Sequence, residues 1–233
     1  MTTTTTGEVG AAYASCRGRI GALVRAAGDN TVKASTVPAC PEWSAHDVVA
    51  HLAGVVSDAL AGNLDGVATD PWTAAQVEAR RDRPVDEVLD EWDTGAATFE
   101  SVLDAVGDPG RQAVLDVVTH EHDIRGALGA AGARDSDAVR IGLGFVAPRF
   151  VDAAAAQHGL SVRIVADDGD GTSFGAVDAP FTLTAAPFEL VRALTGRRSV
   201  EQLAEMKWEG DCSVVIPAFT YGPFAPAAVP IEE

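Results

Sequence analysis

The stretch 116-DVVTHEHDIRGALG-129 carries His120 and His122, two of the chain's five histidines, in an otherwise apolar segment. If the segment is helical, Asp116 and His120 stand one turn apart on the same face. An imidazole and a carboxylate at this spacing can hold one divalent metal ion. His122 lies about 200° around the helix from His120 and cannot share that face, whereas Asp123 can lie beside it. This face of the helix is therefore a candidate metal site.

A metal ion held there needs a ligand from another segment, and His51 is the best candidate. It lies among Val48, Leu52 and Val55, where a lone histidine is out of place in an apolar face. Helix bundles build metal sites from ligands on facing helices. Three protein ligands leave one coordination position open, as in catalytic zinc sites. Nitrogen and oxygen donors favour Zn²⁺ first and are also compatible with Ni²⁺, Mn²⁺ or Fe²⁺.

Each of these polar residues also has a structural interpretation. His51 and His122 could be core histidines with satisfied hydrogen bonds, and His122 could instead support a ligand. Asp123 and Arg125 could form a surface pair or orient a ligand. His46 lies in the first turn of its helix and is expected to be solvated. The residue types and their spacing leave these alternatives open.

Apolar residues at three- and four-residue steps predict the helices that would position this site. Ser44 is expected to cap its helix together with Asp47, and the last helix is expected to bend or break near Pro148. The segments 28–43 and 62–71 are predicted as loops, residues 1–7 as a loose tail, and no strand is expected before about residue 155. The predicted helices are 8–27, 44–61, 84–106, 108–129 and 136–158.

The pattern changes near residue 160, where β-branched and aromatic residues alternate between Gly/Asp turns. Strands are predicted at 160–166, 181–185 and 211–219, and helices at 187–196 and 200–206. The expected fold class is α+β: a metal-binding helix bundle over residues 1–157, then a small α+β domain over residues 158–233.

The composition excludes several classes of partner. The chain has 34 acidic and 17 basic residues and a net charge of −17, which disfavours nucleic acid and anionic membrane surfaces. It shows no signal-peptide pattern and no apolar run long enough to span a membrane. Three widely spaced cysteines do not make a disulfide framework, so a cytoplasmic location is expected. Both a monomer and a homodimer remain open.

Three segments resemble the mycothiol-dependent maleylpyruvate isomerase family. In 37-VPACPEWSAHDVVAHLAG-54 the Val-Pro, the Cys-Pro-x-Trp and the Asp47, His51 and Leu52 positions match a family signature. The stretch 116–129 is similar to the family's second metal motif. The segment 189-ELVRALTGRRSVEQL-203, with Gly210-Asp211, resembles its C-terminal domain. The resemblance covers nearly the whole chain.

The resemblance implies a DinB-like up-down four-helix bundle followed by a sterol-carrier-like domain. It places the metal ligands on His51, Asp116 and His120, with one departure, because the family's characterised isomerases have glutamate where this chain has Asp116. It also implies mycothiol, a low-molecular-weight thiol, as a second cofactor. The expected enzyme is an isomerase or S-transferase in which a metal-bound thiolate attacks a small electrophilic substrate.

Two alternatives of other classes stand beside this expectation. The first is a metal-dependent hydrolase that uses bound water as its nucleophile. The second is a non-catalytic protein that binds a metal ion or a small ligand.

Overall fold

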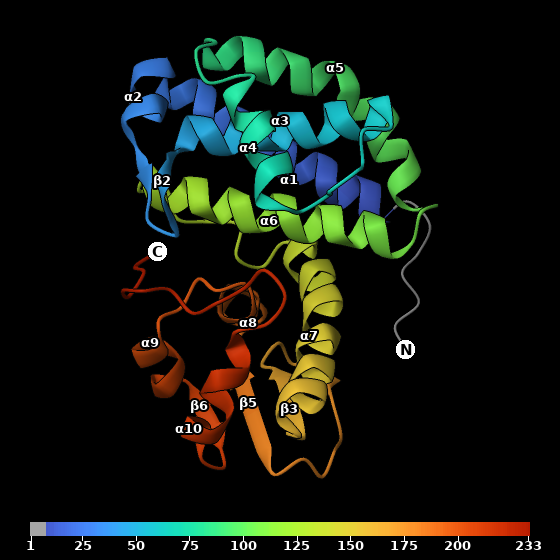
Figure 1. Ribbon diagram of the computed structural model, residues 1–233, viewed down its shortest axis with the longest axis vertical. Coiled ribbons are helices and arrows are strands. Elements are labelled where there is room, and N and C mark those ends of the chain that lie inside the picture. The colour runs from blue at the N-terminus through green and yellow to red at the C-terminus, as the bar shows by residue number, and fades with distance from the viewer. Residues whose placement is uncertain (1–7) are drawn as a thin grey trace. The chain divides into compact units, whose positions relative to one another are not determined.

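The computed structural model describes residues 8–233, so the predicted tail at residues 1–7 lies outside the described chain. Contacts divide these residues into two compact units, here called the N-terminal unit, which ends at Gly132, and the C-terminal unit, Ala133–Glu232. The first is dominated by helices and the second combines helices with a sheet (Figure 1). The predicted α+β fold class is confirmed.

Four long helices form the N-terminal bundle. Each of α1 and α3 packs against both α5 and α6, so the four close a ring around one core. Trp92 and Tyr13 meet inside it, where the indole N–H donates to the phenol oxygen at 3.2 Å. All four helices were predicted from their apolar periodicity. Their bounds are α1 Glu8–Ala27, α3 Ala45–Ala61, α5 Val85–Leu103 and α6 Asp108–Ala127.

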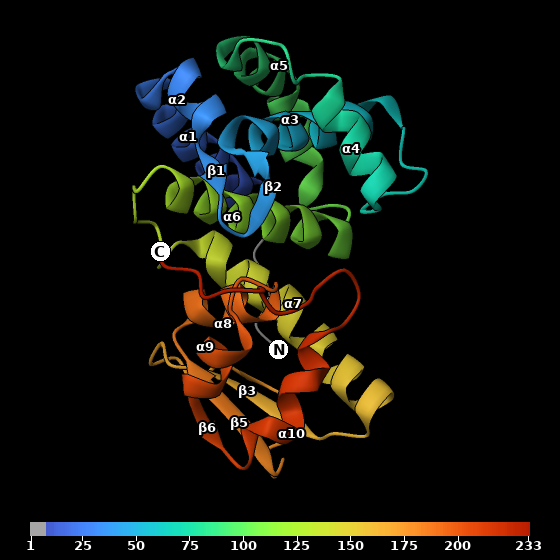
Figure 2. The same cartoon turned by 60° about the vertical axis from the view of Figure 1, so that its left-hand side comes forward.

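Short elements fill segments that were predicted as loops. A helix, α2 (Asp29–Ala34), and a two-stranded antiparallel hairpin of β1 (Thr36–Val37) and β2 (Cys40–Ser44) precede α3. The expectation of no strand in this half was therefore wrong. The hairpin contacts α3 through β2 and α6 through β1 (Figure 2). It reaches the two helices that carry the candidate ligands.

The start of α3 is fixed as the sequence predicted. The Ser44 hydroxyl accepts from the Asp47 backbone N–H at 3.2 Å, and the Asp47 carboxylate accepts from the Ser44 backbone N–H at 2.9 Å. This reciprocal capping box satisfies two backbone donors that the helix itself leaves unpaired. It sets where α3 begins and hence which face presents His51.

The C-terminal unit contains a four-stranded sheet in the order β4-β3-β5-β6, in which only the β3–β5 pair is parallel. The helix α7 packs on α8, β3 and the 3-10 turn η1. The ring of Phe150 on α7 packs at a tilt against that of Phe219, with 4.6 Å between the ring centres. The elements are α7 Asp137–His158, β3 Val162–Ala166, β4 Ser173–Phe174, β5 Phe181–Ala185, α8 Pro187–Leu194, α9 Val200–Glu205, β6 Lys207–Glu209, α10 Cys212–Val215 and η1 Ile216–Phe219.

Three details differ from the predictions for this half. The strand predicted at 211–219 is instead α10 and η1, because the Asp211 carboxylate accepts from the Ser213 backbone N–H and starts a helical turn. The helix α7 runs through Pro148 as one element. It also groups with the C-terminal unit, whereas the predicted boundary after residue 157 kept it with the bundle. It groups there because it packs against α8, η1 and β3 of the C-terminal unit.

No helix within residues 8–233 is long and apolar enough to cross a membrane.

An arginine cluster on Glu91 holds the segment between α4 (Asp70–Glu78) and α5. Arg80 and Arg83 both donate to the Glu91 carboxylate, and the Ser57 hydroxyl donates to it at 2.7 Å. Burial raises the pKa of Glu91, but the hydrogen bonds from Arg80, Ser57 and Arg83 outweigh it and lower the pKa to about 2. The ionised form is therefore the one that the folded chain favours.

Glu91→Gln is expected to lower the free energy of unfolding at neutral pH by about 1–3 kcal/mol. The folded-state pKa lies below the unfolded value, so this stability is complete above pH 4.5 and is lost as the pH falls towards 2. Urea unfolding at pH 7 and pH 3 should show the difference between the two chains shrinking at the lower pH. Glu87→Gln is the control, because the Glu87 side chain is 63% exposed. A pH-independent difference would contradict the assignment.

Candidate metal site

The site lies where α3 faces α6 inside the N-terminal unit. His51 comes from α3, and Asp116 and His120 come from successive turns of α6. The helix α6 is tied to α1 by Glu121, whose side chain is 1% exposed and accepts from Arg19 at 2.7 and 2.6 Å. Arg125 also donates to Glu121, at 3.0 Å. This partly buried ion pair links α6 to α1 and contributes to the orientation in which Asp116 and His120 face α3.

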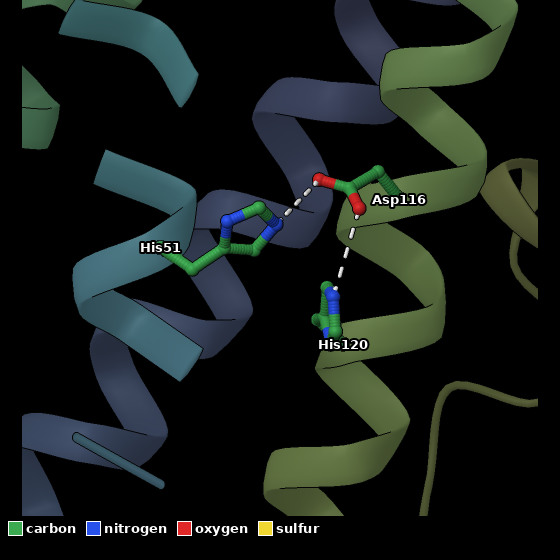
Figure 3. Close-up of side chains that lie close together, drawn as sticks. All are labelled: His51, Asp116 and His120. Atoms are coloured by element: carbon green, nitrogen blue, oxygen red, sulfur yellow. Dashed lines mark ion pairs between the residues drawn. The ribbon is translucent and has the colours of Figure 1, made fainter. Parts of the chain in front are cut away.

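The Asp116 carboxylate lies between the two imidazoles (Figure 3). Its Oδ2 is 3.6 Å from His51 Nε2, and its Oδ1 is 3.6 Å from His120 Nε2. One potential ligand atom from each residue lies within 4.8 Å of the others. The structure thus brings together the three residues that the sequence singled out.

Trp43 covers the two histidines from the end of β2. Its ring centre lies 5.6 Å from that of His51 and 6.4 Å from that of His120, with the latter pair stacked. The histidine side chains are 7% and 11% exposed, whereas that of Asp116 is 32% exposed. An external molecule can therefore approach the cluster past the carboxylate. Trp43 lies within the segment 37–54, and its place over the two histidines was not predicted from the sequence.

The Nδ1 atom of each imidazole also has a hydrogen-bond partner. His120 Nδ1 lies 2.9 Å from an Asp123 carboxylate oxygen, and Asp123 is 1% exposed. His51 Nδ1 lies 2.8 Å from Gln76 Oε1. With Nδ1 engaged in each ring, Nε2 is the nitrogen presented to Asp116. Gln76 was missed because α4 was not predicted.

The electrostatics of the cluster favour positive charge. Burial lowers the pKa of His51, but the charge of Asp116 and hydrogen bonds to the oxygens of Asp116 and Gln76 outweigh burial, so its pKa lies above the ordinary histidine value. A carboxylate between two imidazoles attracts a cation for the same reason that it favours protonation.

The remaining predicted polar residues lie outside this cluster. His122 is 4% exposed and is not among the three clustered residues. His46 was expected to be solvated and is instead 1% exposed, with its Nε2 2.9 Å from the Arg83 carbonyl oxygen. Burial lowers its pKa. Asp123 is 1% exposed and therefore does not belong to a surface pair. It meets His120, and Arg125 meets Glu121.

The donor set fits a divalent metal ion. Ligand atoms around tetrahedral Zn²⁺ are about 3.3 Å apart. Each Nε2 lies 3.6 Å from an Asp116 oxygen, a different one for each ring, and one potential ligand atom of each residue lies within 4.8 Å of the others, so binding a metal ion requires the three side chains to draw together. Metal-bound histidines almost always donate their second ring nitrogen to a carboxylate or carbonyl oxygen, and both histidines here have such a partner. Three donors fall short of the four that close a structural site.

Fold and site together define a helix-bundle protein with a candidate metal centre on facing helices. The family model for the mycothiol maleylpyruvate isomerase N-terminal domain matches residues 13–135, and the chain belongs to this family of enzymes. The resemblance found in the sequence is confirmed.

Solved structures show the same fold. A histidine-to-alanine mutant of the mycothiol-dependent maleylpyruvate isomerase aligns with a TM-score of 0.59, and another structure of that isomerase with 0.55. Each is 12% identical to this chain and covers 84% of it, and the chain covers 92% of each. No curated protein matches the chain by sequence.

Proposed function

We propose that this chain is a metal-dependent enzyme that uses a low-molecular-weight thiol, mycothiol, to act on a small electrophilic substrate. The observation that carries the proposal is the cluster of His51, Asp116 and His120, with one potential ligand atom of each within 4.8 Å of the others. Mycothiol is proposed as the thiol because the family and the structurally similar enzymes are named for it.

The chain supplies three donors and leaves room for a fourth. His51 and His120 offer neutral nitrogen and Asp116 offers a negative oxygen, a set suited to Zn²⁺ and also to Ni²⁺ or Mn²⁺. A divalent metal ion held by these residues would lower the pKa of a thiol that takes the open position and so supply a thiolate near neutral pH. The partly exposed Asp116 side is where the thiol would enter.

Two reactions follow from a thiolate held there. It can add to an activated double bond, allow rotation about the resulting single bond and leave again, which isomerises the substrate. It can instead attack an electrophilic carbon, expel a leaving group and remain attached, which is S-transfer. Trp43 shields the two histidines, so the residues that select the electrophile are expected around the exposed edge of Asp116.

Thermal unfolding with added thiols tests this proposal. Mycothiol at about one hundred times its Kd should raise the free energy of unfolding by about 2.7 kcal/mol, a shift of a few degrees. The shift should require the metal-loaded protein and a free thiol, so mycothiol disulfide and the His120→Ala chain serve as controls.

The other outcomes separate the alternatives. An equal shift in the metal-free protein would contradict the thiol–metal arrangement. Substrate turnover without any thiol would favour a hydrolase that uses bound water. A metal-loaded protein that no thiol stabilises would favour a non-catalytic metal-binding role.

A further inference from the structure

A relay of hydrogen bonds runs from Asp58 on α3 through Gln76 on α4 to His51, which also lies on α3. The Asp58 carboxylate accepts from Asn63 Nδ2 at 2.9 Å through one oxygen and from Gln76 Nε2 at 2.7 Å through the other. Gln76 Oε1 lies 2.8 Å from His51 Nδ1. Asp58 and Gln76 are thus linked to the candidate site without touching Asp116 or His120 in these bonds.

The relay fixes which atom of the Gln76 amide faces His51. An ionised carboxylate only accepts hydrogen bonds, so Asp58 requires the amide NH₂ group on its side. The amide oxygen, an acceptor, is then left for His51, and His51 Nδ1 must carry the proton. In a neutral imidazole this leaves the lone pair on Nε2, the atom 3.6 Å from Asp116.

The packing of α4 on α3 shows that the position of Gln76 is built into the fold. Gln76 is 3% exposed. A Cβ atom at Gly54 would come within 2.5 Å of Gln76 Cβ and 2.7 Å of its Cγ, so only glycine lets α4 approach this closely. Arg80 Nη1 donates to the Gln76 carbonyl oxygen at 3.0 Å. Burial of a flexible polar side chain costs free energy unless its polar atoms form hydrogen bonds. Both the oxygen and the nitrogen of the Gln76 amide form one.

His120 has the same arrangement with a different partner. Its Nδ1 is bonded directly to the buried Asp123 carboxylate, whereas His51 is bonded to a neutral amide that is itself oriented by a carboxylate. Both rings therefore present Nε2 to the same carboxylate, although the partners come from different helices.

We propose that Gln76, oriented by Asp58, is a positioning residue that holds His51 in the Nδ1–H tautomer and directs its Nε2 lone pair to the metal ion. The proposal rests on the proposed function for the metal itself, while the tautomer is a property of the metal-free chain. Loss of such a supporting partner weakens metal affinity by about 10–100-fold.

The test compares Gln76→Met with wild type. Methionine has a similar length and lacks the strong acceptor. Competitive titration with a chromogenic chelator should show Zn²⁺ binding weakened by about 10–100-fold. Histidine ¹⁵N spectra of the metal-free chains, at a pH where the imidazoles are neutral, should show the Nδ1–H tautomer of His51 in wild type and a mixture in the variant. His120 should keep its tautomer in both.

Two further variants keep the test decisive. Glu78→Ala, on the same helix, removes an exposed ion pair with Arg81 and should change neither readout. Asp58→Asn, in which either amide orientation of Gln76 can be accommodated, should give a second His51 tautomer and a several-fold weaker affinity, even if Gln76→Met does not fold.

Unchanged Zn²⁺ affinity and an unchanged His51 tautomer in both relay variants would overturn the proposal, and a lower melting temperature alone would then mark Gln76 as structural. A wild-type chain that binds no metal ion would refute the proposed function instead. The tautomer of the metal-free chain would still decide the role of Gln76.

Discussion

His51→Ala and Asp116→Ala chains are expected to lose the bound metal ion that the wild-type chain retains. Each substitution removes one of three donors, and two donors hold Zn²⁺ far more weakly than three. Mass spectrometry of protein purified without a histidine tag should give about one divalent metal ion per wild-type chain and less than about a tenth of that in either variant. Circular dichroism should show that the helices remain.

Control variants must show that metal binding depends on the three clustered residues and not on the loss of any histidine. His122→Ala removes the histidine two residues after His120 on α6, and His158→Ala removes an exposed one at the end of α7. Both should keep their metal ion. Asp116→Glu keeps a carboxylate at this position and should bind metal, whereas Asp116→Asn should not. A wild-type chain that stays metal-free after incubation with Zn²⁺, Ni²⁺ and Mn²⁺ would contradict the metal site.

The three clustered residues were predictable because their placement depends on helical geometry. Asp116 and His120 are four residues apart on a helix, and the helical repeat puts them on one face. His51 follows from the same rule on α3, where a histidine interrupts the apolar side. The capping box at Ser44 fixes the start of that helix from local sequence alone. Such short-range rules need no knowledge of tertiary contacts.

The supporting residues were not predictable by those rules. Helix α4 buries only Gln76 and Val77, too few apolar positions to show a helical period. Its place is set by the missing side chain at Gly54 and by the arginine cluster on Glu91, which are contacts between segments distant in sequence. His46 was misjudged for a similar reason, because the Arg83 carbonyl oxygen that satisfies it comes from the segment after α4.

The strand predicted at 211–219 shows a conflict between side-chain type and local hydrogen bonding. The run of β-branched residues favours a strand. Asp211 instead caps a helical turn, and Pro217 lacks the N–H that a sheet ladder would need. Capping outweighed β-propensity in this short segment.

Binding of mycothiol to the metal-loaded chain at pH 7 is expected to release close to one proton per thiol. A free cysteine-type thiol has a pKa of about 8.5 and is almost fully protonated at pH 7, whereas one that takes the open position binds as the thiolate. With Nδ1 of His51 and of His120 each bonded to a protein oxygen, neither ring is expected to exchange a proton in this step. Calorimetry in buffers of different ionisation enthalpy measures the release.

The sign of the pH dependence follows from the same pKa difference. Below pH 8.5 the apparent affinity for mycothiol should increase about tenfold for each unit by which the pH rises, because each unit makes the free thiolate about tenfold more abundant. Above it the affinity should level off and proton release should fall to zero. S-methyl mycothiol and the His120→Ala chain should release no proton. Thiol binding with no proton release at pH 7 would show that the thiol stays protonated, and the cluster of His51, Asp116 and His120 would then not be what activates it.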